Sequence, residues 1–147
     1  MISKIIGEIM KINIKDIMYY GRHYTDITSE PYWWFGKDDY QIYSSESLIK
    51  EYSYKDTDDI LQSEYFIPLF QTDIIELEKE FLAEYNSRPL QDKTEKLVTQ
   101  ANGNFDLAFK TLIEVEEGMS ENWYGFERKK LYNDAVNWCQ KHNIKYQ

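Results

Sequence analysis

The stretch YWWFGKDDYQIY at residues 32–43 decides the fold that this sequence predicts. Two runs of aromatic or β-branched residues, 32–35 and 40–43, flank four turn-forming residues, 36–39, in a pattern typical of a β-hairpin. Pro31 suits the first position of the first strand, because a missing N–H costs little hydrogen bonding there. We therefore expect two short antiparallel strands at this point in the chain.

Both faces of the predicted hairpin carry aromatic rings. Side chains alternate along a strand, so Trp33 and Phe35 share one face while Tyr32 and Trp34 share the other. We expect a helix to cover one of these faces and the other to remain available to a partner.

Short helices and a third strand are expected around the hairpin. The expected elements are helices over Asn13–Tyr20, Ser45–Glu51 and Asp56–Ser63 and a strand over Tyr65–Leu69. Asn13 is a suitable N-cap for the first helix, and Ser44 or Ser45 for the second. Pro68 implies that the third strand lies at a sheet edge or leaves the sheet at this point. Residues 1–12 suit an extended arm.

The second half of the chain predicts four helices with clear capping signals. One begins after Asp73, which has the spacing of a capping box, and ends at Arg88-Pro89. The others are expected over Leu90–Ala101, from Asn104 to Gly118, and from Ser120 onward. In the last helix a single face is expected to carry Tyr124, Leu131, Ala135, Trp138 and His142.

These elements together predict an α+β fold. A small antiparallel hairpin, extended to a three-stranded sheet if 65–69 joins it, would pack on a mainly helical C-terminal half. The length of 147 residues suits a single domain over 1–147. Within it we expect a mixed α/β part over 13–70 and a helical part over 71–147.

Charge and cysteine content exclude several classes of protein. With 17 basic and 26 acidic residues the net charge is 17 − 26 = −9. Binding to nucleic acid or to an anionic membrane surface is therefore not expected, because such binding needs excess Lys and Arg. Cys139 is the single cysteine and cannot form an internal disulfide. We expect no cofactor and no metal, and a cytoplasmic location, since nothing resembles an export signal.

The residues that could carry chemistry favour structural roles. Asp56-Thr57-Asp58-Asp59 superficially resembles a calcium loop, but Leu61 and Ile67 occupy the positions of its glycine and its bidentate glutamate. His23 and Asp26 could form a general base pair, although a surface or hydrogen-bonded structural role is the simpler interpretation. Cys139 lies near a helix C-terminus, which does not favour a thiolate.

Two groups of residues resemble the UPF0158 family of bacterial proteins. The first is Phe66-Ile67-Pro68-Leu69, followed by Asp73 and then Glu80-Phe81. The second comprises Phe105 and Phe109, Trp123-Tyr124-Gly125-Phe126, Ala135, Trp138-Cys139 and Asn143-Ile144. The resemblance covers roughly residues 13–146 and implies one intact bacterial domain with a β-hairpin near Pro31–Tyr43. It implies no activity, cofactor or catalytic residue.

Aromatic residues are unusually abundant, at 24 of 147, and Tyr is the commonest of them. Most should build a core, but Tyr, Trp and Arg are also enriched at interaction surfaces. The candidate interaction surface consists of Trp33, Trp34, Tyr43 and Arg128. We expect a non-enzymatic interaction or regulatory protein that binds another protein. The alternatives are a small-molecule-binding domain with an aromatic-lined pocket and an enzyme without a local sequence motif.

Overall fold

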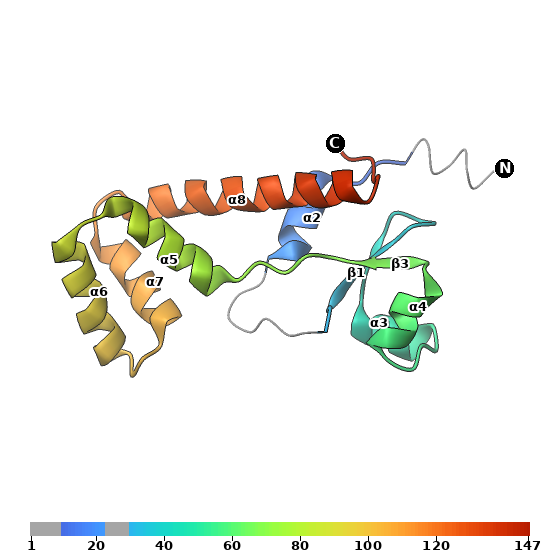
Figure 1. Ribbon diagram of the computed structural model, residues 1–147, viewed down its shortest axis with the longest axis horizontal. Coiled ribbons are helices and arrows are strands. Elements are labelled where there is room, and N and C mark those ends of the chain that lie inside the picture. Colours follow the sequence, from blue (N-terminus) through green and yellow to red (C-terminus); the bar gives the residue numbers. More distant parts are fainter. Residues whose placement is uncertain (1–9, 23–29) are drawn as a thin grey trace. The chain divides into compact units, whose positions relative to one another are not determined.

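The computed structural model describes residues 10–22 and 30–147, and it confirms the α+β class. Within these residues the chain forms a three-stranded antiparallel sheet and seven helices (Figure 1). Contacts divide the chain into two compact units. The sheet unit comprises the described residues of 10–22, 30–71 and 131–147, and the helical unit comprises residues 72–130. The prediction of a single domain over 1–147 stays a prediction.

The predicted hairpin is present in the sheet unit. Strands β1 (Trp33–Gly36) and β2 (Ile42–Ser44) pair antiparallel, and β3 (Phe66–Pro68) pairs with the other side of β1. The order β2-β1-β3 makes β3 an edge strand. The edge position suits Pro68, because proline has no N–H to donate to a further strand. The third strand expected from the sequence is therefore confirmed.

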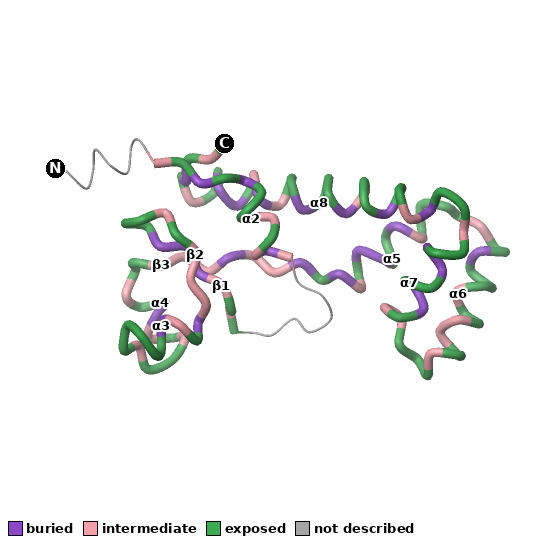
Figure 2. The backbone as a smooth tube through the Cα atoms, turned by 180° about the vertical axis from the view of Figure 1, so that it is seen from behind, coloured by how far each residue is buried: buried purple, intermediate pink, exposed green. Residues whose placement is uncertain are grey.

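Helices α3 (Ser45–Glu51) and α4 (Thr57–Ser63) cover the face of the sheet that carries Trp34. The Trp34 side chain is fully buried with Leu48 of α3 and Ile60 of α4. Figure 2 shows buried backbone along β1, whereas α3 and α4 alternate between exposed and more buried positions. This face of the hairpin is thus occupied by the chain itself.

The opposite face of the sheet is covered by two segments far apart in the sequence. Phe35 packs in one core with Ile17 of α2 (Ile14–Gly21) and with Trp138. Trp138 belongs to the last part of α8 (Met119–Lys141), and its Nε1 donates a hydrogen bond to the Pro68 carbonyl oxygen at 3.1 Å. Both faces of the sheet are therefore buried, and the expectation that one stays open is wrong for the centre of the sheet.

The helical unit consists of α5, α6, α7 and the first part of α8. The bounds of the first three are Ile74–Tyr85, Arg88–Gln100 and Phe105–Val115. Its core contains Phe81, Phe109 and Trp123, with the Phe109 and Trp123 rings 4.8 Å apart at 73°. The Trp123 ring at the start of α8 therefore packs edge to face on the Phe109 ring of α7.

Side chains cap six of the described helices. Asn13, Ser44, Asp73 and Asn104 are caps that the sequence predicts, whereas Asp56 and Ser87 are additional caps and Ser120, the expected start of the last helix, lies within α8. The capping oxygens of Asn13, Ser44, Asp56, Asp73, Ser87 and Asn104 each accept a hydrogen bond from a first-turn N–H. Pro89 differs from its expected place, because it lies in the first turn of α6 and not beyond the last turn of α5. A first-turn proline is tolerated, since the N–H that it lacks would have no partner within the helix.

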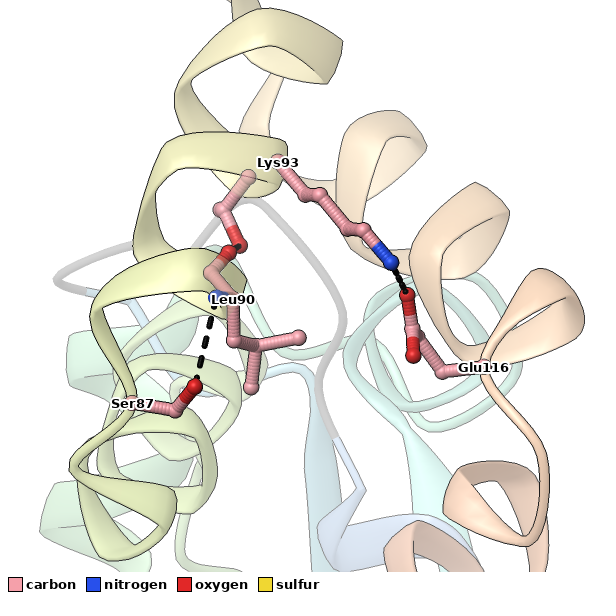
Figure 3. A network of polar contacts seen from close by, with 5 residues as sticks. Ser87, Leu90, Lys93 and Glu116 are labelled. Carbon is pink, nitrogen blue, oxygen red and sulfur yellow. Dashed lines mark hydrogen bonds and ion pairs between the residues drawn. The ribbon is translucent and has the colours of Figure 1, made fainter.

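One end of α6 is held to the end of α7 by side chains (Figure 3). The Ser87 hydroxyl accepts a hydrogen bond from the Leu90 N–H at 3.3 Å, which starts α6. One turn later the Lys93 ammonium pairs with the Glu116 carboxylate at 2.6 Å. Glu116 is the C-cap of α7, so this ion pair joins the first half of α6 to the C-terminal end of α7.

The buried face of α8 differs from the one expected. Tyr124 is 54% exposed, whereas Trp123, Glu127 and Leu131 are buried. Leu131, Ala135 and Trp138 are buried as predicted, but in the first half of the helix the buried residues are Met119, Trp123 and Glu127 in place of Tyr124. Within the described residues no helix combines the length and the apolar character needed to cross a membrane.

Candidate functional site

Trp34 is not part of an interaction surface, and its assignment there is wrong. Its side chain is 0% exposed, and its Nε1 donates a hydrogen bond to the Ser45 hydroxyl at 2.8 Å. The Ser45 hydroxyl in turn donates to the Pro31 carbonyl oxygen at 2.7 Å. The tryptophan is buried because α3 and α4 pack over its face of the sheet.

Of the other three candidate residues, Trp33 and Tyr43 lie on opposite faces of the sheet, and Arg128 belongs to the other unit. Trp33 is half-buried on the Phe35 side of the sheet, with its ring 4.5 Å from that of Tyr20. Tyr43 lies on β2 and packs on the Trp34 side. Arg128 is exposed on α8 and belongs to the helical unit. Of the four predicted residues, only Tyr43 lines the feature described next.

A recess of about 430 Å³ opens beside the hairpin in the sheet unit. It is lined by Gly36, Asp38, Asp39, Tyr43, Tyr52, Tyr54, Tyr65 and Phe66, and is called the tyrosine recess below. Its residues come from the hairpin, from the end of α3 and the loop that follows, and from the start of β3. Four tyrosines and two aspartates make it both aromatic and acidic.

Gly36 makes the base of the tyrosine recess possible. Along β1 it follows Trp34 on the same face, and its cross-strand neighbour on β3 is Phe66. A Cβ at Gly36 would lie 3.2 Å from a ring carbon of Tyr43, closer than the neighbour tolerates without moving. Without that Cβ, the rings of Tyr43 and Phe66 approach to 5.6 Å between centroids.

The rings of the tyrosine recess meet at nearly right angles. Tyr43 and Phe66 are inclined by 83°, Tyr43 and Tyr52 by 79°, and Tyr54 and Phe66 by 89°. Edge-to-face contacts of this kind are favourable because the positive edge of one ring meets the negative face of the next. Tyr52 and Tyr65 are 51% and 59% exposed, so the outer rings remain accessible to solvent.

A carboxylate is fixed inside the tyrosine recess. The Tyr43 hydroxyl donates a hydrogen bond to Asp39, and the other oxygen of Asp39 accepts one from the Gln41 N–H at 3.1 Å. The bond to Asp39, together with partial burial and the neighbouring Tyr52 hydroxyl, raises the pKa of Tyr43 above its ordinary value. Tyr43 therefore stays a neutral donor, and the negative charge resides on Asp39. No Lys or Arg is among the lining residues.

The residues weighed for catalysis have structural surroundings. Cys139 is fully buried, and burial raises the pKa of its thiol to about 11, which opposes formation of a thiolate. Burial lowers the pKa of His142, and the nearby Lys141 and Lys37 lower it further. The predicted His23 and Asp26 pair lies outside the described residues.

The acidic stretch before α4 starts a helix. The Asp56 carboxylate accepts a hydrogen bond from the Asp59 N–H at 2.9 Å, and Asp59 accepts one from the Lys55 N–H, also at 2.9 Å. Carboxylates at this position also favour the positive end of the helix dipole. Across residues 10–22 and 30–147, no three His, Cys, Asp or Glu residues gather in a way that could hold a metal ion.

Glu78 is a buried carboxyl that the sequence interpretation missed. It is 2% exposed on α5, and burial, followed by its hydrogen bond with Asp106, raises its pKa to about 9. Burial alone would raise the pKa of Asp106, but hydrogen bonds from Lys110 and Glu78 lower it. A neutral Glu78 thus donates to an ionised Asp106, which also pairs with Lys110 at 2.8 Å. The sequence signal that could have indicated this burial is the position of Glu78 beside Leu77 in the apolar stripe of α5.

Comparison of the chain with protein-family models, with curated proteins and with solved structures finds no match.

Proposed function

We propose that the protein is a non-enzymatic interaction module that binds another protein through the tyrosine recess. The observation that carries this proposal is the recess itself, with accessible Tyr52 and Tyr65 rings around the neutral donor Tyr43. Tyrosine is favoured at protein interfaces because it contributes a large contact area with few rotatable bonds and a polar tip. The proposal includes a bacterial, cytoplasmic protein of the UPF0158 family, which rests on the residue resemblance alone.

The packing of the recess supports recognition of a partner. The rings of Tyr43, Tyr52, Tyr54 and Phe66 are held by edge-to-face contacts, and Tyr43 also by its hydrogen bond to Asp39, so these side chains would lose little freedom on binding. Preorganised aromatic residues bordered by polar groups are the typical centre of a protein interface. Tyr43 therefore keeps its predicted role, whereas Trp34 supports the recess from within the core.

A small-molecule-binding domain is the second candidate. The recess volume of about 430 Å³ lies within the ordinary range for ligand pockets, roughly 300–1,000 Å³. The exposure of Tyr52 and Tyr65 favours the protein partner, because a small ligand is usually enclosed by most of its pocket.

The proposal is tested by capture and reconstitution. Partners captured from an extract of the source organism would be purified, and their affinity measured for the wild type and for the double variant Tyr52→Ala, Tyr65→Ala. Tyr132→Ala is the matched control, because Tyr132 is 47% exposed in the same unit but does not line the recess. We expect the double variant to lose at least about tenfold in affinity, as hot-spot aromatics do. Equal affinity for all three proteins would contradict the proposal.

A further inference from the structure

We propose that the tyrosine recess binds a cationic side chain, arginine or lysine, presented by a basic segment of a partner protein. This inference rests on the proposed function and names the chemistry of the partner. It follows from the combination of aromatic rings, a fixed carboxylate with a second one beside it, and accessible volume in one recess.

The aromatic lining favours a cation. The face of an aromatic ring carries negative potential, so a guanidinium or ammonium group within about 6 Å of the ring centre is attracted. The recess is lined by the rings of four tyrosines and Phe66, and those of Tyr52 and Tyr65 are more than half exposed, so a cation can reach them from solvent.

The two carboxylates of the recess, Asp38 and Asp39, also favour a positively charged ligand. Asp39 is held in place by the Tyr43 hydroxyl and the Gln41 N–H, and Asp38 is exposed beside it in the turn. Neither of them is neutralised within the recess, since none of its lining residues is Lys or Arg. A guanidinium that enters the recess could therefore reach carboxylate oxygens in addition to ring faces, and charge-assisted hydrogen bonds are the stronger kind.

The charge of the whole chain favours a basic partner. At −9 it attracts positively charged segments over distances comparable to the Debye length, which raises association rates at low salt. The recess volume of about 430 Å³ suits one long side chain of an extended segment. These observations favour a protein segment over a nucleic acid, whose phosphates the carboxylates would repel.

The test compares peptides that differ only in charge. A short Gly/Ser peptide with one central arginine and the same peptide with citrulline, its neutral isostere, are titrated into the full chain by ¹H–¹⁵N NMR. A lysine and norleucine pair repeats the comparison. We expect the Gly36, Asp38 and Tyr65 amide signals to shift with the cationic peptides only. The shift should weaken as salt is raised from 50 to 500 mM.

Variants locate the binding. Tyr65→Ala and Asp38→Asn change exposed side chains, so the fold should persist, and each should weaken binding of the arginine peptide about three- to tenfold. Tyr132→Ala should leave the affinity unchanged. Equal shifts with the arginine and citrulline peptides, or none with either, would overturn the proposal.

Free tetramethylammonium, a small organic cation, is titrated in a separate experiment. If it binds the recess while the arginine and lysine peptides do not, the ligand is a small organic cation and the inference of a protein segment is wrong. The proposed function fails separately. If the purified partner still binds the Tyr52→Ala, Tyr65→Ala variant while arginine peptides bind the wild-type recess, the partner proposal fails and the cation chemistry stands.

Discussion

Ser45 shows how a single small side chain organises the core of the sheet unit. Its hydroxyl accepts a hydrogen bond from the buried Trp34 Nε1 and donates one to the Pro31 carbonyl oxygen. The same residue begins α3, so the helix that covers Trp34 also provides the hydrogen-bond acceptor for the indole N–H, the only polar group of the Trp34 side chain. A buried N–H donor without a partner costs free energy of folding, so the burial of Trp34 depends on the Ser45 hydroxyl.

Replacement of Ser45 by alanine should therefore be destabilising. The Ser45→Ala variant leaves the Trp34 N–H unpaired in the core, and we expect a loss of about 1–3 kcal/mol in the free energy of unfolding. Ser47→Ala is the control, since the Ser47 hydroxyl donates to Glu51 in an exposed setting. Urea titration followed by tryptophan fluorescence measures both. Equal midpoints for Ser45→Ala and the wild type would contradict the prediction.

Glu78 makes the stability of the helical unit depend on pH. Its pKa is raised from 4.5 in the unfolded chain to about 9 in the folded protein. The proton is therefore bound more tightly in the folded state, and the stabilisation is fully present below about pH 4.5. It is lost progressively as pH rises toward 9. Glu78 releases its proton at a lower pH in the unfolded chain than in the folded protein, so ionisation favours the unfolded state.

The Glu78→Gln variant should remove this dependence. A glutamine keeps a donor for Asp106 but carries no proton that can be released. We expect it to stabilise the protein by about 1–3 kcal/mol at pH 8 and to have little effect near pH 4.5. Urea unfolding at the two pH values measures the difference. A variant that is destabilised equally at both pH values would show that folding does not shift the pKa of Glu78.

At the scale of elements, two helical glycines have opposite surroundings. Gly21 ends α2, and a Cβ there would lie 2.3 Å from a ring carbon of Phe70. Gly125 lies inside α8, and a Cβ there would have no heavy atom outside its own helix and chain neighbours within 4 Å. The first glycine permits a close approach of a helix to an aromatic ring, whereas the second only lowers helix propensity.

Alanine at these two positions should therefore have effects of opposite sign. Gly21→Ala forces α2 and Phe70 apart and should destabilise by about 1–3 kcal/mol. Gly125→Ala should stabilise by about 0.5–1 kcal/mol, because it replaces glycine in the interior of a helix. Thermal unfolding by circular dichroism compares the two. A decrease in melting temperature for both variants would contradict the argument for Gly125.

At the scale of the whole molecule, the chain leaves the sheet unit and returns to it. Residues 131–147 complete a unit that begins more than a hundred residues earlier. Ile12 and Tyr146 form a parallel bridge, in which the Ile12 N–H donates to the Lys145 carbonyl oxygen at 2.9 Å. Ile144 is buried in the same core. The sheet unit therefore depends on the last residues of the chain, and the helical unit does not include them.

Removal of residues 142–147 should weaken the sheet unit selectively. The truncation takes away the bridge and the buried Ile144, and we expect a loss of more than about 2 kcal/mol. Amide hydrogen exchange should become faster in β1 and β2 while Phe109 and Leu112 in α7 keep their protection. An equal loss of protection in both units would show that the two unfold together.

The sequence by itself determined the local structure of this protein. The turn formers between two aromatic runs predicted the hairpin, and the residues before α2, α3, α5 and α7 predicted their caps. These features depend on side-chain alternation and on hydrogen bonds over three or four residues, so a short stretch contains all the information. The alternation also separated Trp34 from Phe35 correctly, and the structure confirms that they lie in different cores.

Only the tertiary structure decided which aromatic and charged residues are buried and which form a recess. The tyrosine recess needs Gly36 beside Phe66, and Tyr52 near Tyr43, contacts that strand register and the end of α3 create. Glu78 of α5 can be buried because Asp106 of α7 forms a hydrogen bond with it, and the sequence of an apolar stripe does not reveal such a partner. Such outcomes depend on long-range packing, since burial of a polar group is acceptable only where distant residues supply its hydrogen bonds.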